Sequence, residues 1–567
     1  MPRSARPLDF VLMLHSHLPW VLNHGRWPHG SDWLTEAALE TYLPLIETLR
    51  GLEADGVDAP ITIGFTPVLA NQLMHPRFVE EMDLFFAQRL AACDEAPASL
   101  SATGEGHLLP LVAWWRERFL RLRALWETIG RDIVGAFRAL EAAGRLEIVG
   151  SAATHGFLPL LARDESIRLQ LGLGFAEHRR IFGREPRGCW VPECAYRPRG
   201  RWQPVPGAPA MPVRRGTDEY VADAGFRYFF VDSHLVMGGE AIGLSSGALA
   251  QPEAPAEATA HQGRVGRTPY RAYGVLSAGR ARTAVLVRDP RASMQVWSRH
   301  QGYPGDGAYL EFHKLRWPGG LRLWRVSAPG TDLGAKAPYD PGAAGARAAE
   351  HARHFASLLG DIAADQASRQ PGVVTVPFDT ELFGHWWFEG PDFLGEMYRS
   401  LGAGRVHPGT AWQHLDAHPP RSGVRLPEGS WGANGDFSMW LNERTAWTWE
   451  RLWPLEERFW EAAPAALVAP EKHAVLGQAA RSLLLAQASD WQFIISTGAV
   501  ADYAERRFAG HCEDAERLVA ALESSDAGAL EAARASLPAL RERDDVFPEI
   551  LAAVSEALDG SRRVSRA

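Results

Sequence analysis

Two acidic residues of the chain stand in settings that suit nucleophilic or acid–base chemistry. Glu193 follows a short apolar run and lies in the segment Trp-Val-Pro-Glu-Cys-Ala-Tyr-Arg, and Asp379 follows another and opens the segment Asp-Thr-Glu-Leu-Phe-Gly-His-Trp-Trp. Two carboxyl groups facing each other across a sugar ring are the minimal equipment for glycoside chemistry, because one attacks the anomeric carbon while the other protonates the leaving oxygen. Aromatic surroundings raise a carboxyl pKa, which suits the acid. The alternative is a structural carboxylate that caps the next helix; we favour catalysis for both residues.

Polar side chains also end other apolar runs. They are His15, His17, Thr66, Thr154, His155, Asp232, His234, Asp289 and Glu381. Catalytic groups of a parallel barrel gather at the carboxyl ends of its strands, so we expect these residues to converge in space. For Asp232, Asp289 and Glu381, a functional and a structural role are equally supported.

Two of these residues, His15 and His17, would point to the same face of a strand because one residue separates them. Together with His155 and an aspartate they could hold a hydrolytic zinc ion. The alternative is that the imidazoles form hydrogen bonds to sugar hydroxyls. The residues alone leave both interpretations open.

Short runs rich in β-branched and aromatic residues recur along the chain and are typical of buried strands. They occupy residues 10–15, 61–66, 146–152, 188–193, 228–232, 283–289 and 373–379. Helical periodicity fills several segments between them, including 39–52, 167–181 and 346–367. Alternation of strand and helix predicts a parallel sheet, and we therefore predict an α/β fold with an irregular seven-stranded (β/α) barrel.

Two regions depart from this alternation. Residues 111–143 predict two helices inside an inserted helical subdomain, residues 93–145. After about Gly409 only helical patterns remain, in 445–462, 472–489, 499–524, 527–541 and a last helix ending near Leu558. The predicted organisation is a catalytic barrel (1–92 and 146–408), the insertion (93–145) and an all-helical C-terminal domain (409–567).

Composition excludes several classes of partner. The 567 residues carry a formal net charge of −9, whereas nucleic acids and anionic membranes attract basic surfaces. No apolar stretch approaches the roughly 20 residues of a membrane helix. Four cysteines without C-x-x-C spacing indicate reduced thiols and a cytoplasmic protein. Several of the 21 tryptophans, in Gly-flanked or polar contexts, suit stacking on sugar rings, with core packing as the alternative: Trp27, Trp33, Trp190, Trp386, Trp387, Trp431 and Trp440.

Several segments, in this order, resemble glycoside hydrolase family 57, most closely its α-glucan branching enzymes. The matching stretches are His-Ser-His-Leu-Pro-Trp (15–20), Gly-Phe-Thr-Pro (64–67), Ala-Thr-His-Gly-Phe-Leu-Pro (153–159), Trp-Val-Pro-Glu-Cys-Ala-Tyr (190–196), Phe-Asp-Thr-Glu-Leu-Phe-Gly-His (378–385) and Trp-Gly-Ala-Asn through Trp440. Residues 288–297, 302–305 and 483–491 also look like branching enzymes.

The resemblance implies that Glu193 is the nucleophile and Asp379 the general acid/base of a retaining enzyme acting on an α-1,4-glucan. It also implies the seven-stranded barrel and the helical C-terminal domain. His15, His17 and His155 would contact substrate without a metal, and no cofactor is expected. The resemblance further implies that Trp297, Trp431 and Trp440 line the glucan groove, with Asp490 beside it.

Four functions remain to be separated. The first is a 1,4-α-glucan branching enzyme, and the second is an α-amylase or 4-α-glucanotransferase with the same residues. The third is a metal-dependent hydrolase or deacetylase, and the fourth is a glucan-binding module without turnover. The region 238–267 is longer than the loop that shields the glycosyl-enzyme in family branching enzymes and contains no tyrosine, although Tyr270 and Tyr273 follow it.

Overall fold

The computed structural model describes residues 8–26, 29–206, 208–209, 211–237, 267–277, 282–298, 302–328, 330–366, 372–401 and 404–564. Every run predicted as a strand forms one: β1 (Leu8–Ser16), β2 (Ile61–Phe65), β3 (Leu146–Ser151), β4 (Gly188–Trp190), β7 (Tyr228–Val231), β9 (Ala284–Val287) and β10 (Val373–Asp379). Nearly all of region 238–267 lies outside the described residues, and so does Trp27.

These strands pair in the order β10-β1-β2-β3-β4-β7-β9, and every pair in this order is parallel. A parallel bridge between Arg288, just after β9, and Thr375 in β10 closes the ring. The predicted seven-stranded barrel is confirmed. It is irregular because β11 (Val406–Pro408) pairs with β1, and β8 (Tyr273–Val275) runs antiparallel to β9 and pairs with β12 (Gly423–Val424).

Alternating side chains of the strands belong to two separate cores. Val11 and Met13 of β1 pack with Trp190 and Phe230 in one cluster, whereas Phe10, Leu12 and Leu14 belong to the larger cluster shared with the helices. Successive side chains of a strand point to opposite faces, so His15 continues the row of Val11 and Met13. In β10, Asp379 continues the row of Val373 in the same way. The strand period therefore brings both residues to the carboxyl end of the barrel interior.

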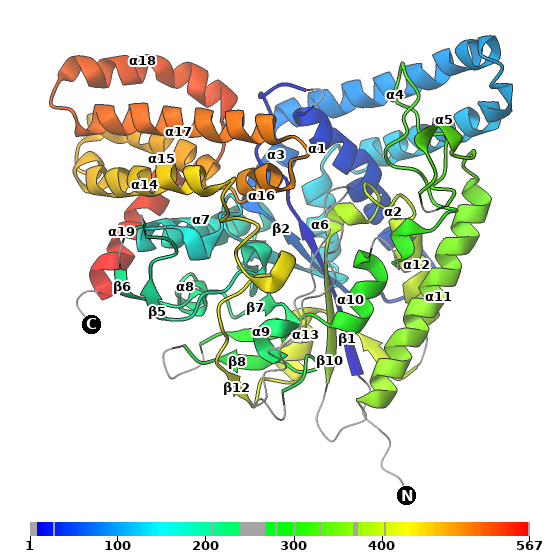
Figure 1. The fold of residues 1–567 in the computed structure, drawn as a ribbon, viewed down its shortest axis with the longest axis horizontal. Helices are drawn as coiled ribbons and strands as arrows, with labels where there is room; N and C mark the ends of the chain where they lie inside the picture. Colours follow the sequence, from blue (N-terminus) through cyan, green and yellow to red (C-terminus); the bar gives the residue numbers. More distant parts are fainter. Residues whose placement is uncertain are drawn as a thin grey trace, which may run out of the picture.

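Helices cover the outside of the barrel (Figure 1). They are α1 (Ser31–Ala37), a π-helical turn (Ala38–Tyr42), α2 (Leu43–Ala54), α3 (Pro67–Met74), α6 (Ile133–Ala142), α7 (Asp164–Phe182), α8 (Thr217–Asp223), α9 (Ser233–Met237), α10 (Pro290–Trp297), α11 (Pro341–Asp365), α12 (Gly390–Leu401) and α13 (Ala411–Ala417). A two-stranded ribbon of β5 (Gly200–Trp202) and β6 (Met211–Arg214) lies beside them. The predicted helices at 39–52, 167–181 and 346–367 match α2, α7 and α11.

The inserted region is a hairpin of α4 (Pro76–Ala102) and α5 (Leu109–Thr128), which projects to the upper right of Figure 1. Residue 93, the predicted start of the insertion, lies in the middle of α4. The helix therefore begins well before the predicted boundary, and the division into domains stays a prediction.

The C-terminal helices form the second lobe; α14 to α18 lie at the upper left of Figure 1, and α19 lies below them against α7. They are α14 (Ala446–Leu467), α15 (His473–Ala486), α16 (Asp490–Thr497), α17 (Ala501–Glu523), α18 (Ala527–Arg543) and α19 (Ile550–Val564). Helix α15 packs against α14, α17, α18 and α19. Because neighbours surround it, nearly every residue from Val475 to Ala486 is buried.

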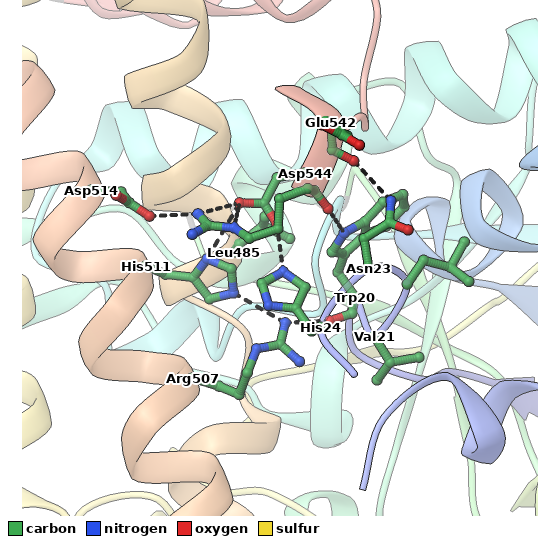
Figure 2. Close-up of polar contacts among 12 residues, drawn as sticks. Trp20, Val21, Asn23, His24, Leu485, Arg507, His511, Asp514, Glu542 and Asp544 are labelled. Atoms are coloured by element: carbon green, nitrogen blue, oxygen red, sulfur yellow. Dashed lines mark hydrogen bonds and ion pairs between the residues drawn. The ribbon is translucent and has the colours of Figure 1, made fainter. Parts of the chain in front are cut away.

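A polar cluster ties this lobe to the segment after β1 (Figure 2). His24 Nε2 lies 2.6 Å from Asp544 Oδ1, and Arg543 donates to Asp544 Oδ2 at 2.7 Å. The indole of Trp20 donates to the carbonyl of Arg543 at 3.0 Å, and the Asn23 amide donates to the carbonyl of Glu542. These contacts fix the chain just beyond His17 against the lobe that carries Asp490.

No helix in the described ranges is long and apolar enough to cross a membrane. Cys93, Cys189, Cys194 and Cys512 are all buried free thiols.

Candidate active site

The Glu193 side chain is held at the barrel mouth by donors from two distant segments. Its Oε2 accepts a 2.7 Å hydrogen bond from the indole of Trp431, and its Oε1 accepts one of 3.3 Å from Ser489. Glu193 sits in a one-turn 3-10 helix with a left-handed backbone, φ 60°. A non-glycine residue in this conformation is strained and persists only when its surroundings fix it. Here the Trp431 amide donates to the Glu193 carbonyl at 3.0 Å.

The pKa of Glu193 is raised to about 7, first by burial. The negative charge of Asp490 raises it further, whereas the Trp431 hydrogen bond lowers it. The side chain keeps 16% of its surface exposed, so a substrate can reach it.

Asp379 has a different environment. Burial raises the pKa of its carboxyl well above the ordinary value, and the negative charges of Glu381 and Glu193 add to this effect. Within the described part of the chain, its carboxyl accepts no hydrogen bond that would stabilise the charged form. The two carboxyls lie at one end of the barrel: Trp297 contacts both Trp431, which donates to Glu193, and Phe378, which precedes Asp379. Burial and the neighbouring negative charges therefore favour the protonated form of Asp379.

The three predicted histidines form one stack beside these carboxyls. His15 Nε2 lies 2.9 Å from His155 Nε2, and the His17 and His155 rings stack with centroids 4.1 Å apart. His17 bridges Thr66 and Asp490 through its two ring nitrogens, at 2.9 and 2.8 Å. Burial lowers the pKa values of His15 and His155 well below the ordinary value, with the charge of His17 adding to it. These two imidazoles are therefore neutral at neutral pH.

Two family models match long parts of this chain. The model of glycosyl hydrolase family 57 matches residues 11–427, a stretch that contains the barrel and both carboxyls. The chain belongs to this family. A second model, described as the C-terminal region of 1,4-alpha-glucan branching enzyme, matches residues 452–554.

Relatives in family 57 include named branching enzymes. The chain is 39% identical over 521 residues to 1,4-alpha-glucan branching enzyme TK1436 of Thermococcus kodakarensis, covering 90% of this chain and 73% of the relative. It is 32% identical to a probable 1,4-alpha-glucan branching enzyme of Mycobacterium tuberculosis, covering 92% and 94%.

Solved structures of two related enzymes superpose on this chain over nearly its full length. The crystal structure of the branching enzyme from Pyrococcus horikoshii superposes with a TM-score of 0.85 at 36% identity, covering 96% of each chain. The α-amylase AmyC of Thermotoga maritima superposes with a TM-score of 0.77 at 27% identity, covering 97% and 99%.

Three acidic residues that sequence left undecided have structural partners. Asp232 is fully buried and paired with Arg288 at 2.9 Å. Asp289 caps α10, where it accepts a 2.7 Å hydrogen bond from the Ala292 amide. Glu381 accepts hydrogen bonds from the hydroxyl of Tyr42 and from the amide of His17, at 3.2 Å for the latter. Glu381 acts on the site indirectly, because its charge raises the pKa of Asp379.

Two groups of histidine and aspartate have ligand atoms within 4.8 Å of one another: His17 with His155 and Asp490, and His24 with His511 and Asp544. In the first group, hydrogen bonds engage both nitrogens of each imidazole. In the second, Arg507 donates to His511 Nε2 at 3.2 Å, which leaves the proton of the neutral imidazole on Nδ1, facing Asp544. Hydrogen bonds thus account for the ring nitrogens of the first group, whereas His511 Nδ1 lies 4.0 Å from Asp544 Oδ2 and has no hydrogen-bond partner among the described residues. The metal-free assignment stays a prediction.

The predicted aromatic residues divide into two kinds. Trp190, Trp387 and Trp440 are almost fully buried, which favours the core-packing alternative; the Trp440 ring stacks on Phe157 with centroids 4.4 Å apart. Trp431 and Trp297 lie beside the carboxyls, with ring centroids 6.1 Å apart. Trp386 is 51% exposed. Whether Trp297, Trp431 and Trp440 contact a glucan stays a prediction.

Two residues of the site were missed by sequence reasoning. Ser489 touches both His155, at 2.9 Å, and Glu193. Arg288 lies over the Trp297 and Trp431 rings at 5.8 and 5.6 Å and lowers the pKa of Asp379. Ser489 and Arg288 each precede an aspartate in the sequence. The sequence pattern does not indicate that their side chains point into the site.

Proposed function

We propose that the chain is a 1,4-α-glucan branching enzyme that works by a retaining double displacement. The contrast between its two carboxyl groups carries this proposal. Glu193 receives hydrogen bonds that favour its charged form, whereas Asp379 receives none from the described residues and is buried beside two like charges. Environments that push two pKa values apart assign the base or nucleophile to one group and the acid to the other.

In the first displacement, Glu193 attacks the anomeric carbon of an internal glucose unit. The bond from C1 to the leaving O4 breaks, Asp379 gives its proton to that oxygen, and a covalent glycosyl-enzyme forms at Glu193. In the second, the 6-hydroxyl of an acceptor chain loses its proton to Asp379 while its oxygen bonds to C1 and displaces Glu193. The product carries an α-1,6 branch.

The neutral histidines would form hydrogen bonds to hydroxyls of the reacting glucose, and His17 would be oriented for this by Asp490. Trp297, which is partly buried, would offer its ring surface to the glucan, whereas Trp431 is 3% exposed and would hold Glu193 through its indole N–H. The reaction needs no cofactor. We also propose a cytoplasmic location and a role in building a glycogen-like polymer; the four free thiols support a reducing compartment.

Linkage analysis of the products from amylose tests the proposal. The expected result is new α-1,6 linkages, seen as short chains released by a debranching enzyme, with few new reducing ends. The Glu193→Gln variant should yield neither, because the amide cannot attack the anomeric carbon. Products with new reducing ends and no α-1,6 linkage would refute branching.

That opposite result is the signature of the second candidate, an α-amylase of the same family. The structural similarity to AmyC over nearly the full length of both chains supports it. The match of residues 452–554 to the branching-enzyme C-terminal model favours branching.

A further inference from the structure

A second cavity lies outside the catalytic site. It has a volume of about 310 Å³ and is bounded by α1 and the π-helical turn, by the α4–α5 hairpin and by the segment 315–322. Residues that characterise it are Glu36, Glu40, Arg89, Arg118, Trp317 and Arg322. We call it the outer cavity. Its size falls at the lower end of the roughly 300–1,000 Å³ of small-ligand sites.

The rim of the outer cavity carries an exposed indole on a rigid turn. Trp317 is 59% exposed. The turn that presents it is closed by the Arg316 amide, which donates to the Leu321 carbonyl at 2.8 Å. Gly319 and Gly320 follow with φ of 95° and 66°, a left-handed pair that glycine adopts without strain. Arg89 of α4 donates to the Gly319 carbonyl at 2.9 Å, so the hairpin holds the turn in place.

Charges around the outer cavity balance. The carboxylates of Asp32, Glu36 and Glu40 face the guanidinium groups of Arg89, Arg118 and Arg322. Arg89 pairs with Glu36 at 3.3 Å and Arg322 with Glu40 at 3.1 Å. A site without excess charge does not favour an anion or a cation; it suits a neutral ligand with many hydroxyl groups.

One of these cations is left with unused donors. The Arg118 guanidinium lies 4.5 Å over the Phe388 ring and, among the residues that the structure describes, it makes no hydrogen bond or ion pair. A guanidinium has five N–H donors and no acceptor. Arg118 therefore offers donors to oxygen atoms of a ligand in the cavity.

The outer cavity is connected to the catalytic loops. Glu40 also accepts a hydrogen bond from His385 at 2.6 Å, and His385 belongs to the turn that begins at Asp379. The neighbouring Trp386, half exposed, stacks on Phe312 with ring centroids 5.2 Å apart, and Arg322 covers Phe312 at 5.0 Å. Aromatic surface thus extends from the catalytic turn towards the outer cavity.

We propose that the outer cavity is a second binding site for α-glucan, in which Trp317 stacks on a glucose ring and Arg118 donates to its hydroxyls. This inference rests on the proposed function. Trp386 and Phe312 would guide the same chain, or a neighbouring branch, between this site and the catalytic carboxyls. Two linked contacts on one polymer raise the effective concentration of glucan at the catalytic site. The cavity would therefore favour long chains over short oligosaccharides.

Affinity electrophoresis in gels containing amylopectin tests the proposal, with dextran gels as the polysaccharide control. We expect Trp317→Ala and Arg118→Gln to weaken retardation by amylopectin, the first by roughly tenfold in Kd because aromatic anchors dominate such contacts. The matched control is Trp447→Ala, which removes another partly exposed indole, 37% exposed on α14. It should migrate as the wild type does.

Kinetics supply a second readout. Trp317→Ala should raise KM for amylose roughly tenfold with little change in kcat, while KM for maltoheptaose changes far less. Wild-type retardation in both Trp317→Ala and Arg118→Gln, or equal losses in Trp447→Ala, would overturn the second site. If the wild-type protein itself neither binds amylopectin nor acts on amylose, the proposed function fails instead.

Discussion

The hydrogen bond from Trp431 to Glu193 predicts a measurable change in the pH dependence of activity. The variant Trp431→Phe removes the N–H donor and keeps an aromatic ring for packing against Trp190, whose centroid lies 4.8 Å away. Because the donor stabilises the charged carboxylate, its loss raises the pKa of Glu193 above the present value of about 7.

The size of this shift follows from the strength of the bond. A hydrogen bond to a charged group contributes about 1.5–3 kcal/mol, and one pKa unit corresponds to about 1.4 kcal/mol. The full effect would be about one to two units. Glu193 is partly exposed and keeps Ser489 as a donor, so we expect about one unit.

The assay is the initial rate of amylose modification, followed by loss of iodine staining across the pH range. Activity requires ionised Glu193, so the acid limb of kcat/KM should move to higher pH by about one unit in Trp431→Phe. The apparent pKa of this acid limb reflects both coupled carboxyls rather than one residue. Loss of the Trp431 donor must still move it to higher pH.

The matched control is Trp297→Phe. The Trp297 indole lies in the same aromatic group, but its N–H has no partner among the described residues. Its acid limb should stay in place even if the rate falls. The reasoning is refuted if Trp431→Phe loses activity uniformly at all pH values, or if both variants shift alike.

Three further predictions concern the acid, the metal question and the interlobe cluster. Asp379→Asn should lower kcat by about 10²–10⁴-fold and abolish the alkaline fall in activity, since no proton remains to be lost at that position; a retained alkaline limb would contradict its role. Exhaustive chelation should leave the rate on amylose unchanged, and a loss restored by zinc would revive the metal-dependent alternative. Asp544→Asn should lower the free energy of unfolding at pH 7 by about 3–5 kcal/mol, as breaking a buried ion pair does. Burial would raise the pKa of Asp544, but the His24 hydrogen bond and the positive charge of Arg543 help to hold it well below its ordinary value. The stabilisation is therefore present above the unfolded pKa of about 3.9 and is lost as pH falls through the lower folded value. Urea unfolding should show that the free energies of unfolding of Asp544→Asn and the wild type become more similar as the pH falls. A difference in free energy that does not change with pH would contradict the charge argument.

Local sequence was sufficient to predict the barrel strands and the long helices. Each strand is a short apolar run whose side chains are buried on both faces, and such runs differ clearly from the polar turns that follow them. The rule that catalytic groups lie at the carboxyl ends of strands then located Glu193, Asp379 and the histidines. Their order in the chain also allowed the resemblance to family 57 to be recognised.

Element boundaries and the packing partners of individual side chains were harder to predict from the sequence. The insertion was predicted to start at residue 93, yet α4 already begins at Pro76. Trp387 and Trp440 were expected to stack on sugars because polar or glycine neighbours surround them in sequence, but packing in three dimensions buries both. Asp289 was undecided until its backbone position identified it as a helix cap.

The sequence by itself indicated candidate reactive groups and their positions at strand ends, because side-chain chemistry and strand period are local properties. Only the tertiary structure supplies the different surroundings of the two carboxyls. That difference arises from residues remote in the chain: Trp431 and Ser489 donate to Glu193, while Tyr42 and the amide of His17 hold Glu381, whose charge raises the pKa of Asp379. Burial and hydrogen bonding set a pKa, and both depend on contacts that no local pattern encodes.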